Sequence, residues 1–182
     1  MNIFAVDTDP IQAARILPDK HVTKMILETA QMLSIVFSPH YWDIGKVMKK
    51  DGTPFKTEKG AFKNHPCTQW ASQEFSNCAW LIQHGCGLVG EYHHRYGKHH
   101  GLKDSIFECK KLFHRVVDEP ITIHSMVDHF ARAMPEELKY DTTIDDVEAY
   151  RRYLNTKEWA YYNYLRIPER RPDWLQPIET ND

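Results

Sequence analysis

Residues 19–37 read DKHVTKMILETAQMLSIVF and have the pattern of an α-helix. Its apolar side chains recur every three to four positions, which is the period of an α-helix with one buried face. Pro18 precedes the stretch, and aspartate is a residue type that caps helix N-termini. The sequence therefore predicts an amphipathic helix from Asp19 to about Phe37, capped by Asp19. Its apolar positions are Val22, Met25, Ile26, Met32, Leu33 and Val36.

The helical period continues through most of the 182 residues, an ordinary length for one domain. The pattern predicts an all-α, compact single-domain helical bundle over residues 1–182, ending in a Pro-rich and aromatic C-terminal tail. We expect further helices over residues 10–17, 68–96, 105–117, 124–134 and 143–154, the last with a capping-box-like start at Thr143 and Asp146, and one short strand over residues 2–6.

Residues 38–66 interrupt this pattern with several Pro and Gly residues. An irregular segment of this length inside a domain is usually functional or mobile. We expect a mobile Lys-rich insertion, with a hairpin at Asp51-Gly52. Its lysines are Lys46, Lys49, Lys50, Lys56, Lys59 and Lys63.

Charge is distributed unevenly along the chain. The formal net charge is −2, which argues against a generic nucleic-acid coat or a polybasic membrane binder. However, residues 43–115 hold 12 Lys/Arg against 7 Asp/Glu, whereas residues 116–150 hold 2 against 9. The sequence leaves two interpretations open, a solvated patchwork of charge or a basic surface that meets an anion.

A polar edge runs beside the apolar face of the helix predicted over residues 19–37, and it contains His21, Lys24, Glu28 and Gln31. A histidine and a carboxylate two turns apart at the margin of a core are suited to proton transfer. The alternative is a surface ion pair between Lys24 and Glu28, worth about 0.2–0.5 kcal/mol. Both interpretations remain open at this point.

The helix predicted over residues 68–96 repeats this arrangement, with a polar edge of Gln73, Asn77, His84, Glu91 and Arg95. Glu74 falls within the apolar stripe instead, so we expect it to be buried and either paired or protonated. Three glycines, at 85, 87 and 90, weaken the helix and predict the close approach of another helix.

Residues 93–100 read HHRYGKHH. The spacing is not that of a metal site, so we expect no metal and no other cofactor. A cationic helix end that contacts phosphate and an inert solvated helix end both fit this stretch. The N-terminus does not have the pattern of a signal peptide, and no apolar run is long enough to span a membrane. We therefore expect an intracellular, cytoplasmic protein with no membrane partner.

Four motifs occur in an order that resembles the phage pyrimidine-dimer DNA glycosylases of the endonuclease V type. The motifs are Asp19-Lys20-His21-Val22-(x5)-Glu28, His65-Pro66 followed by Trp70, Leu88-Val89-Gly90-Glu91-(x3)-Arg95, and Arg171-Pro172-x-Trp174. The resemblance implies a compact helical fold and a phage-encoded enzyme that acts in the host cell. It also implies cleavage of the glycosidic bond of a damaged or modified pyrimidine in duplex DNA, followed by strand scission at the abasic sugar.

In that family an α-amine attacks the sugar to form an imine, and a glutamate transfers protons. Glu28 matches this glutamate, His21 accompanies it, and Asn2 is the residue that follows the initiator methionine. Phosphate contacts would come from basic residues near the motifs. The candidate DNA contacts are Lys20, Lys24, His65, Arg95 and Lys98.

The sequence also departs from the family pattern. Asn2 is a poor residue for removal of Met1, so Met1, Asn2 or a lysine such as Lys20 or Lys24 could supply the amine. Leu27 and Gln31 stand where the family has arginines. Two other functions therefore remain open, a glycosidase acting on a nucleotide or modified nucleoside, and a non-catalytic helical module that binds nucleic acid or a partner. The oligomeric state is not predicted.

Overall fold

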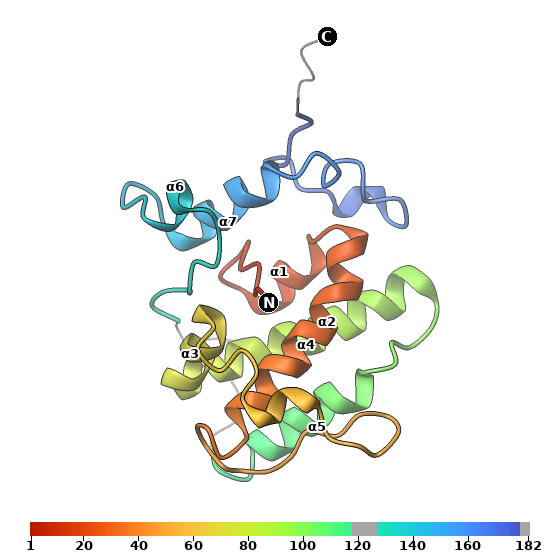
Figure 1. Ribbon diagram of the computed structural model, residues 1–182. Helices are drawn as coiled ribbons and strands as arrows, with labels where there is room; N and C mark the ends of the chain where they lie inside the picture. The colour runs from red at the N-terminus through yellow and green to blue at the C-terminus, as the bar shows by residue number, and fades with distance from the viewer. Residues whose placement is uncertain (118–126, 179–182) are drawn as a thin grey trace.

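Two long helices cross at the centre of the protein, α2 (Asp19–Val36) and α4 (Phe75–Tyr96), as Figure 1 shows. The computed structural model describes residues 1–117 and 127–178, and in these residues it contains helices and no strand, which confirms the predicted all-α fold. The other α-helices are α1 (Pro10–Arg15), α3 (Pro66–Gln73), α5 (Lys103–Phe113), α6 (Glu136–Lys139) and α7 (Asp146–Asn155), and the 3-10 turns are η1 (Lys56–Lys59) and η2 (Pro168–Arg170).

The apolar face of α2 packs against α4, as its periodicity predicts, and the two backbones approach closely. A Cβ atom placed on Gly85 would lie 2.9 Å from Cγ2 of Thr29 in α2. One placed on Gly87 would lie 3.0 Å from Cβ of Ala14 in α1. The expected close approach of other helices is therefore confirmed at Gly85 and Gly87, whereas a Cβ atom on Gly90 would meet nothing within 4 Å.

The C-terminal part of the chain, residues 136–178, forms a layer across the N-terminus and the start of α2 (Figure 1). We call it the C-terminal layer. Long-range hydrogen bonds hold this layer in place. Arg151 Nε donates to the carbonyl of Val6 at 3.0 Å, and the hydroxyl of Tyr164 donates to the carbonyl of Ile16 at 2.6 Å. The first residues of the chain are therefore enclosed between α2 and α7.

A buried arginine joins the ends of three helices. Arg95, near the end of α4, donates from Nε to Glu91 at 2.9 Å and from Nη1 to Asp19 at 3.0 Å. It also donates from Nη1 to the carbonyl of Leu17 and from Nη2 to that of Arg15, both at 2.8 Å. The guanidinium is fully enclosed, so the role predicted for Arg95 in DNA contact is wrong, because every nitrogen of the group is engaged inside the protein.

Asp19 has a different role from the predicted helix cap. The residue preceding α2 is Pro18, and no side chain caps this helix. Besides binding Arg95, the Asp19 carboxylate accepts hydrogen bonds from the backbone nitrogens of Leu165 and Arg166, at 2.9 and 3.2 Å. Asp19 therefore connects the start of α2 to the C-terminal layer.

The helix predicted over residues 68–96 is two helices. The chain breaks at Glu74, whose backbone is extended (φ −136°, ψ 146°). At this junction Glu74 faces solvent, so the prediction that it is buried is wrong. The change of direction between α3 and α4 removes Glu74 from the apolar stripe on which a continuous helix would have placed it.

Three further predictions need correction. Residues 127–134 are irregular where a helix was predicted, and residues 124–126 lie outside the described part of the chain. Residues 2–6 form no strand, and their backbone turns at Phe4, which has a positive φ of 42°. The helix predicted from Thr143 begins at Asp146, where the Asp145 side chain caps it by accepting from Glu148 N.

The Lys-rich segment packs part of its apolar surface against the core. Val47 and Phe55 are buried, and the hydroxyl of Thr57 bonds to that of Ser34 in α2. A single antiparallel bridge between Met48 and Pro54 encloses the predicted turn at Asp51-Gly52. The mobility expected of this segment stays a prediction.

Replacing Arg95 should strongly destabilise the fold. The change Arg95→Ala leaves the buried carboxylates of Asp19 and Glu91 without their shared cation, and such losses cost about 3–5 kcal/mol. Urea denaturation followed by circular dichroism measures this change. Arg152→Ala is the matched control, because Arg152 pairs with Glu148 on the surface, where such a pair is worth less than about 1 kcal/mol. Equal losses in the two variants would contradict the role assigned to the buried network.

Candidate active site

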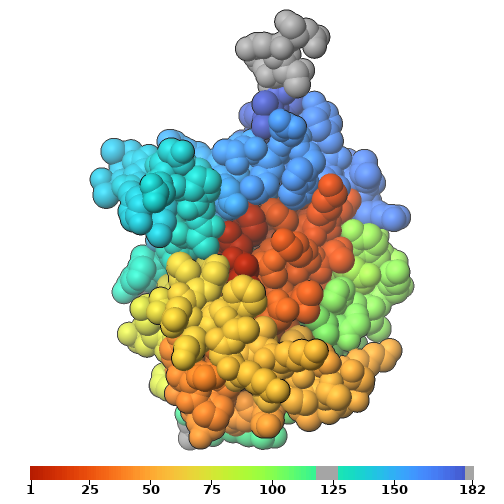
Figure 2. Space-filling model, in the orientation of Figure 1, coloured from red at the N-terminus to blue at the C-terminus, as the bar shows by residue number. Residues whose placement is uncertain are grey.

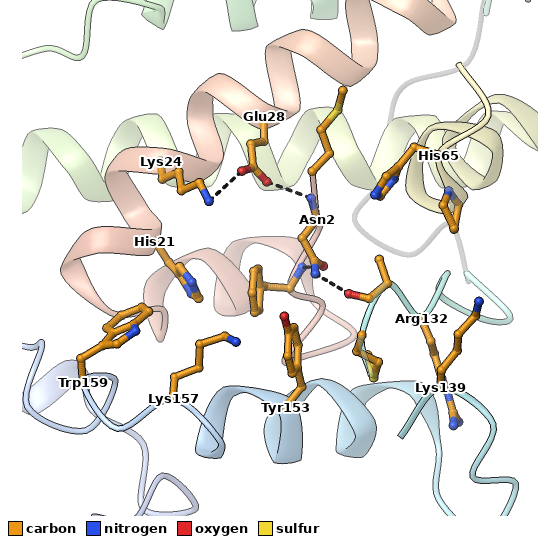
Figure 3. Close-up of a pocket in the computed structure, with 15 residues that line it drawn as sticks. Asn2, His21, Lys24, Glu28, His65, Arg132, Lys139, Tyr153, Lys157 and Trp159 are labelled. Atoms are coloured by element: carbon orange, nitrogen blue, oxygen red, sulfur yellow. Dashed lines mark hydrogen bonds and ion pairs between the residues drawn. The ribbon is translucent and has the colours of Figure 1, made fainter. Parts of the chain in front are cut away.

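An open pocket of about 490 Å³ lies where the N-terminal residues, α2 and the C-terminal layer meet. Figure 2 shows the red N-terminal residues in the recess between the blue C-terminal surface above and the yellow surface below. The close-up in Figure 3 shows the polar side chains that converge there. The lining residues are Met1, Asn2, Phe4, His21, Lys24, Glu28, His65, Pro66, Arg132, Ala133, Met134, Lys139, Tyr153, Lys157 and Trp159.

Glu28 is the only carboxylate among the described residues that line this pocket, and it is 8% exposed. Its Oε2 accepts a hydrogen bond from the backbone nitrogen of Asn2 at 2.8 Å, and its Oε1 lies 3.2 Å from Nζ of Lys24 (Figure 3). The predicted Lys24–Glu28 ion pair is therefore present, but Glu28 also makes a second, buried contact. That contact brings a carboxylate oxygen to the first peptide nitrogen of the chain.

The side chain of Asn2 fixes the position of this nitrogen. Its Oδ1 accepts from the backbone nitrogens of Ile3 and Phe4, at 2.7 and 3.2 Å. Its Nδ2 donates to the carbonyl of Ala133 at 2.7 Å, which ties the N-terminus to the irregular segment that precedes α6. The tight turn that these bonds support includes the positive φ of Phe4 and directs the chain into the pocket.

His21 lies on the same wall of the pocket as Glu28. Its ring packs 4.1 Å from that of Phe4 and edge-on to Trp159 at 5.1 Å, and its Nδ1 is buried without a hydrogen-bond partner in the described part of the chain. Burial, and then the charges of Lys24 and Lys157, lower the pKa of His21 to about 3. The imidazole is therefore neutral at physiological pH and shapes the pocket without adding a charge. Its predicted catalytic role stays a prediction.

His65 lies across the pocket at the start of α3 (Figure 3). Its Nδ1 accepts from Cys67 N at 3.2 Å and so caps this helix. Partial burial, and then the charge of the N-terminal amine, lower the pKa of His65, while Glu28 opposes them. The N-terminal amine is therefore close enough to His65 to influence its protonation.

The wall opposite Glu28 comes from α7 and the residues after it. Nζ of Lys157 lies 4.0 Å from the ring centroid of Tyr153, whose ring stacks on Phe4. Lys139 and Lys157 form no ion pair with a carboxylate in the described ranges 1–117 and 127–178. Lys139, Tyr153 and Lys157 are not among the site residues that the sequence predicts.

The other cation of this wall is already engaged. Arg132 Nε pairs with Asp146, and its terminal nitrogens donate to the carbonyls of Leu138, Asp141 and Ile144. Arg132 therefore organises the segment between α6 and α7, and its guanidinium is not free for a ligand.

Three of the five predicted DNA contacts surround the pocket. Lys24 and His65 line it, and Lys20 is exposed beside it, with Nζ 4.9 Å from the ring centroid of Trp159. Lys98 is exposed but lies outside the lining, and Arg95 is buried in its own network. The contact of Lys20, Lys24, His65 and Lys98 with DNA stays a prediction.

No group of three or more His, Cys, Asp or Glu residues in the described part of the chain is placed to hold a metal ion. Among the helices of residues 1–117 and 127–178, none has the length and apolar character needed to cross a membrane.

The helices of the described residues place the carboxylate of Glu28 against the N-terminal residues, in a pocket that Lys24, Lys139 and Lys157 also line. Residues 1–104 match the family model for pyrimidine dimer DNA glycosylase, and the chain belongs to this family. Membership supports a role as a DNA glycosylase, whose substrate is DNA. Comparisons with curated proteins and with solved structures found no significant match.

The acid sensitivity of the fold should report the state of His21. Because its pKa is about 3 in the folded protein and near 6.5 when unfolded, only the unfolded chain gains a proton as the pH falls below 6.5. His21 should therefore lower the free energy of unfolding by up to about 1.4 kcal/mol for each unit that the pH falls below 6.5. Between pH 7 and pH 4.5 the melting temperature should fall less steeply with decreasing pH in His21→Leu than in the wild type. Replacing the exposed His94 by Leu should leave the slope unchanged, and a wild-type slope in His21→Leu would contradict this account.

Proposed function

We propose that this protein is a DNA glycosylase that cleaves the bond between C1′ and a damaged or modified pyrimidine and then cleaves the strand at the abasic sugar. One observation supports this most strongly: the backbone nitrogen of Asn2 lies 2.8 Å from Oε2 of Glu28. Removal of Met1 would convert that nitrogen into a free α-amine already in contact with a carboxylate. A nucleophilic amine beside a proton acceptor is what imine chemistry requires.

The α-amine of Asn2 is the nucleophile in this proposal. The fixed position of residue 2 supports the choice, because three hydrogen bonds hold the Asn2 side chain. Lys24 is a weaker candidate because its side chain is 69% exposed and its amine pairs with Glu28. Lys20 is exposed and lies over Trp159, away from the carboxylate.

In the first step the amine nitrogen bonds to C1′ while the bond between C1′ and the base breaks. The base leaves with the bonding electron pair and takes up a proton. The nitrogen then gives a proton to Glu28, and its lone pair opens the bond between C1′ and O4′. Glu28 returns the proton to O4′, and a protonated imine remains. Water then takes a proton from C2′, and the electrons of that C–H bond form a C2′–C3′ double bond as the 3′-phosphate leaves with its bonding electrons, which breaks the strand. Hydrolysis of the imine finally frees the amine.

The lysines around the pocket provide the electrostatic part of this proposal. Lys24, Lys139 and Lys157 line the pocket, and Glu28 is its one carboxylate among the described residues, so the lining favours a ligand that carries phosphate. A single nucleotide phosphate would meet the same lysines, so a free nucleotide is the competing substrate.

Glu28→Gln should abolish turnover and preserve the fold. Glutamine keeps the shape and one oxygen of glutamate but cannot accept and return a proton. Side chains that transfer protons contribute about 10²–10⁴-fold to the reaction rate. The assay measures strand cleavage of ultraviolet-irradiated and abasic duplexes, with nucleoside monophosphates tested in parallel. Glu148→Gln, on the surface of α7, is the matched control and should retain activity. Full activity of Glu28→Gln would eliminate Glu28 as the proton carrier, and turnover of nucleotides alone would move the function to small substrates.

The identity of residue 2 should control how much nucleophile is present. Asn2→Ser favours removal of Met1, so we expect a larger processed fraction in the intact mass and more adduct after borohydride reduction in the presence of abasic DNA. Peptide mapping should place the adduct on residue 2. A variant with an uncleavable N-terminal extension is the control and should form no adduct. An adduct that maps to Lys24 or Lys157 would instead assign the reaction to a lysine.

A further inference from the structure

Phe62 is exposed in a backbone conformation that phenylalanine rarely adopts. It is 57% exposed and has a φ of 65°, in the left-handed region where a bulky side chain is strained. It is also not part of the hydrophobic core. The protein therefore holds a large apolar ring in solvent at a conformational cost, and packing of the ring does not explain it. Strain of this kind is concentrated at functional sites.

The turn that carries Phe62 is firmly held. Its backbone is closed by hydrogen bonds from Lys63 N to the Gly60 carbonyl at 3.1 Å and from His65 N to the Phe62 carbonyl at 3.0 Å. The hydroxyl of Tyr41 donates to the carbonyl of Lys63 at 2.6 Å. The ring is therefore presented by a fixed turn whose direction is set by the protein.

Uncompensated lysines flank the ring. Asp51 and Glu58, the acids between residues 46 and 63, pair with Lys49 and Lys46. Lys56, Lys59 and Lys63 are exposed and form no ion pair with any carboxylate that the structure describes. An exposed aromatic ring between free cations is the composition of surfaces that stack on bases and bind phosphates.

This turn adjoins the pocket. Phe62 precedes His65, a lining residue, by three positions, so their Cα atoms are at most roughly 11 Å apart. The rise of DNA is about 3.4 Å per base, so this distance corresponds to about three base steps. In Figure 2 the yellow surface of this part of the chain borders the recess that holds the red N-terminal residues. A duplex at the pocket would therefore extend over the turn.

We propose that Phe62 stacks on a base within about three steps of the attacked nucleotide, while Lys59 and Lys63 bind the adjacent phosphates. The contact rests on the proposed function, because it requires DNA at the pocket. It would stabilise a locally unstacked duplex, as apolar wedges do in other complexes. The charge of the surface favours DNA over a second copy of this chain, whose net charge is only −2.

The test uses a duplex with a non-cleavable tetrahydrofuran abasic analogue and 2-aminopurine at each of the three neighbouring steps. The wild type should increase the 2-aminopurine fluorescence at one step on binding. Phe62→Ala should lose this increase and bind about tenfold more weakly, because base stacking on an aromatic ring is lost. Phe107→Ala, which removes a half-exposed ring from α5, is the matched control and should behave as the wild type.

Two further variants distinguish loss of the DNA contact from loss of the fold. Phe62→Gly removes the ring and the backbone strain together, so its melting temperature should equal or exceed that of the wild type while its binding falls like that of Phe62→Ala. Lys63→Ala should reduce the slope of log affinity against log salt by about one, and Lys103→Ala, at the start of α5, should not change it.

Unchanged affinity and fluorescence in both Phe62 variants would overturn the stacking contact, even where the enzyme still cleaves DNA and forms its imine adduct. A change in elution volume of these variants on size exclusion, with DNA binding unaffected, would assign the ring to self-association and overturn it too. Failure of the wild type to bind any duplex would overturn the proposed function and the stacking contact together.

Discussion

The buried ion network around Arg95 is the interaction on which the arrangement of this protein depends. Arg95 and Glu91 come from the end of α4, and Asp19 from the start of α2. The C-terminal layer joins the same network, because Arg170 donates to Glu91 and the backbone at 165–166 donates to Asp19. Removing one member would leave charge uncompensated in a low-dielectric interior, so the members are mutually dependent.

This network also determines the shape of the pocket. It fixes the C-terminal layer against the start of α2, and that layer supplies Tyr153, Lys157 and Trp159 to the wall opposite Glu28. Seven of the fifteen lining residues lie beyond residue 104, where the match to the family ends. The family segment therefore provides the carboxylate and the N-terminus, while the rest of the chain provides much of the surface that a substrate would meet.

Sequence patterns predicted the helices and the edge that carries His21 and Glu28, because helical period depends on local spacing alone. The same patterns could not separate residues that touch a ligand from those that hold the fold. Asp19, Glu91 and Arg95 all belong to the motifs that resemble the family, yet the structure buries them together. Their burial depends on contacts between residues 76 positions apart, which no local pattern contains.

The helix predicted over residues 124–134 failed for a related reason. In the described residues 127–134, long-range partners replace helical hydrogen bonds: Phe130 N donates to Asp146, the Ala131 carbonyl accepts from Tyr150, and the Ala133 carbonyl accepts from Asn2. These long-range partners satisfy backbone groups that would otherwise bond within a helix. Two of these bonds are made to α7, and the third fixes the N-terminal residue.

The net charge of −2 does not indicate the charge around the pocket, because contacts within the protein engage part of its acidic groups. The segment 116–150 carries nine acids, but some of them are engaged with the protein itself, as Asp146 is with Arg132 and Asp145 is at the start of α7. Among the described residues the pocket is lined by one carboxylate, and its lysines come from α2, from α6 and from the residues after α7. Since screening limits the influence of distant surface charge to about 8–10 Å at physiological salt, these nearby lysines decide what the pocket attracts. An acidic protein can therefore present a site suited to a polyanion.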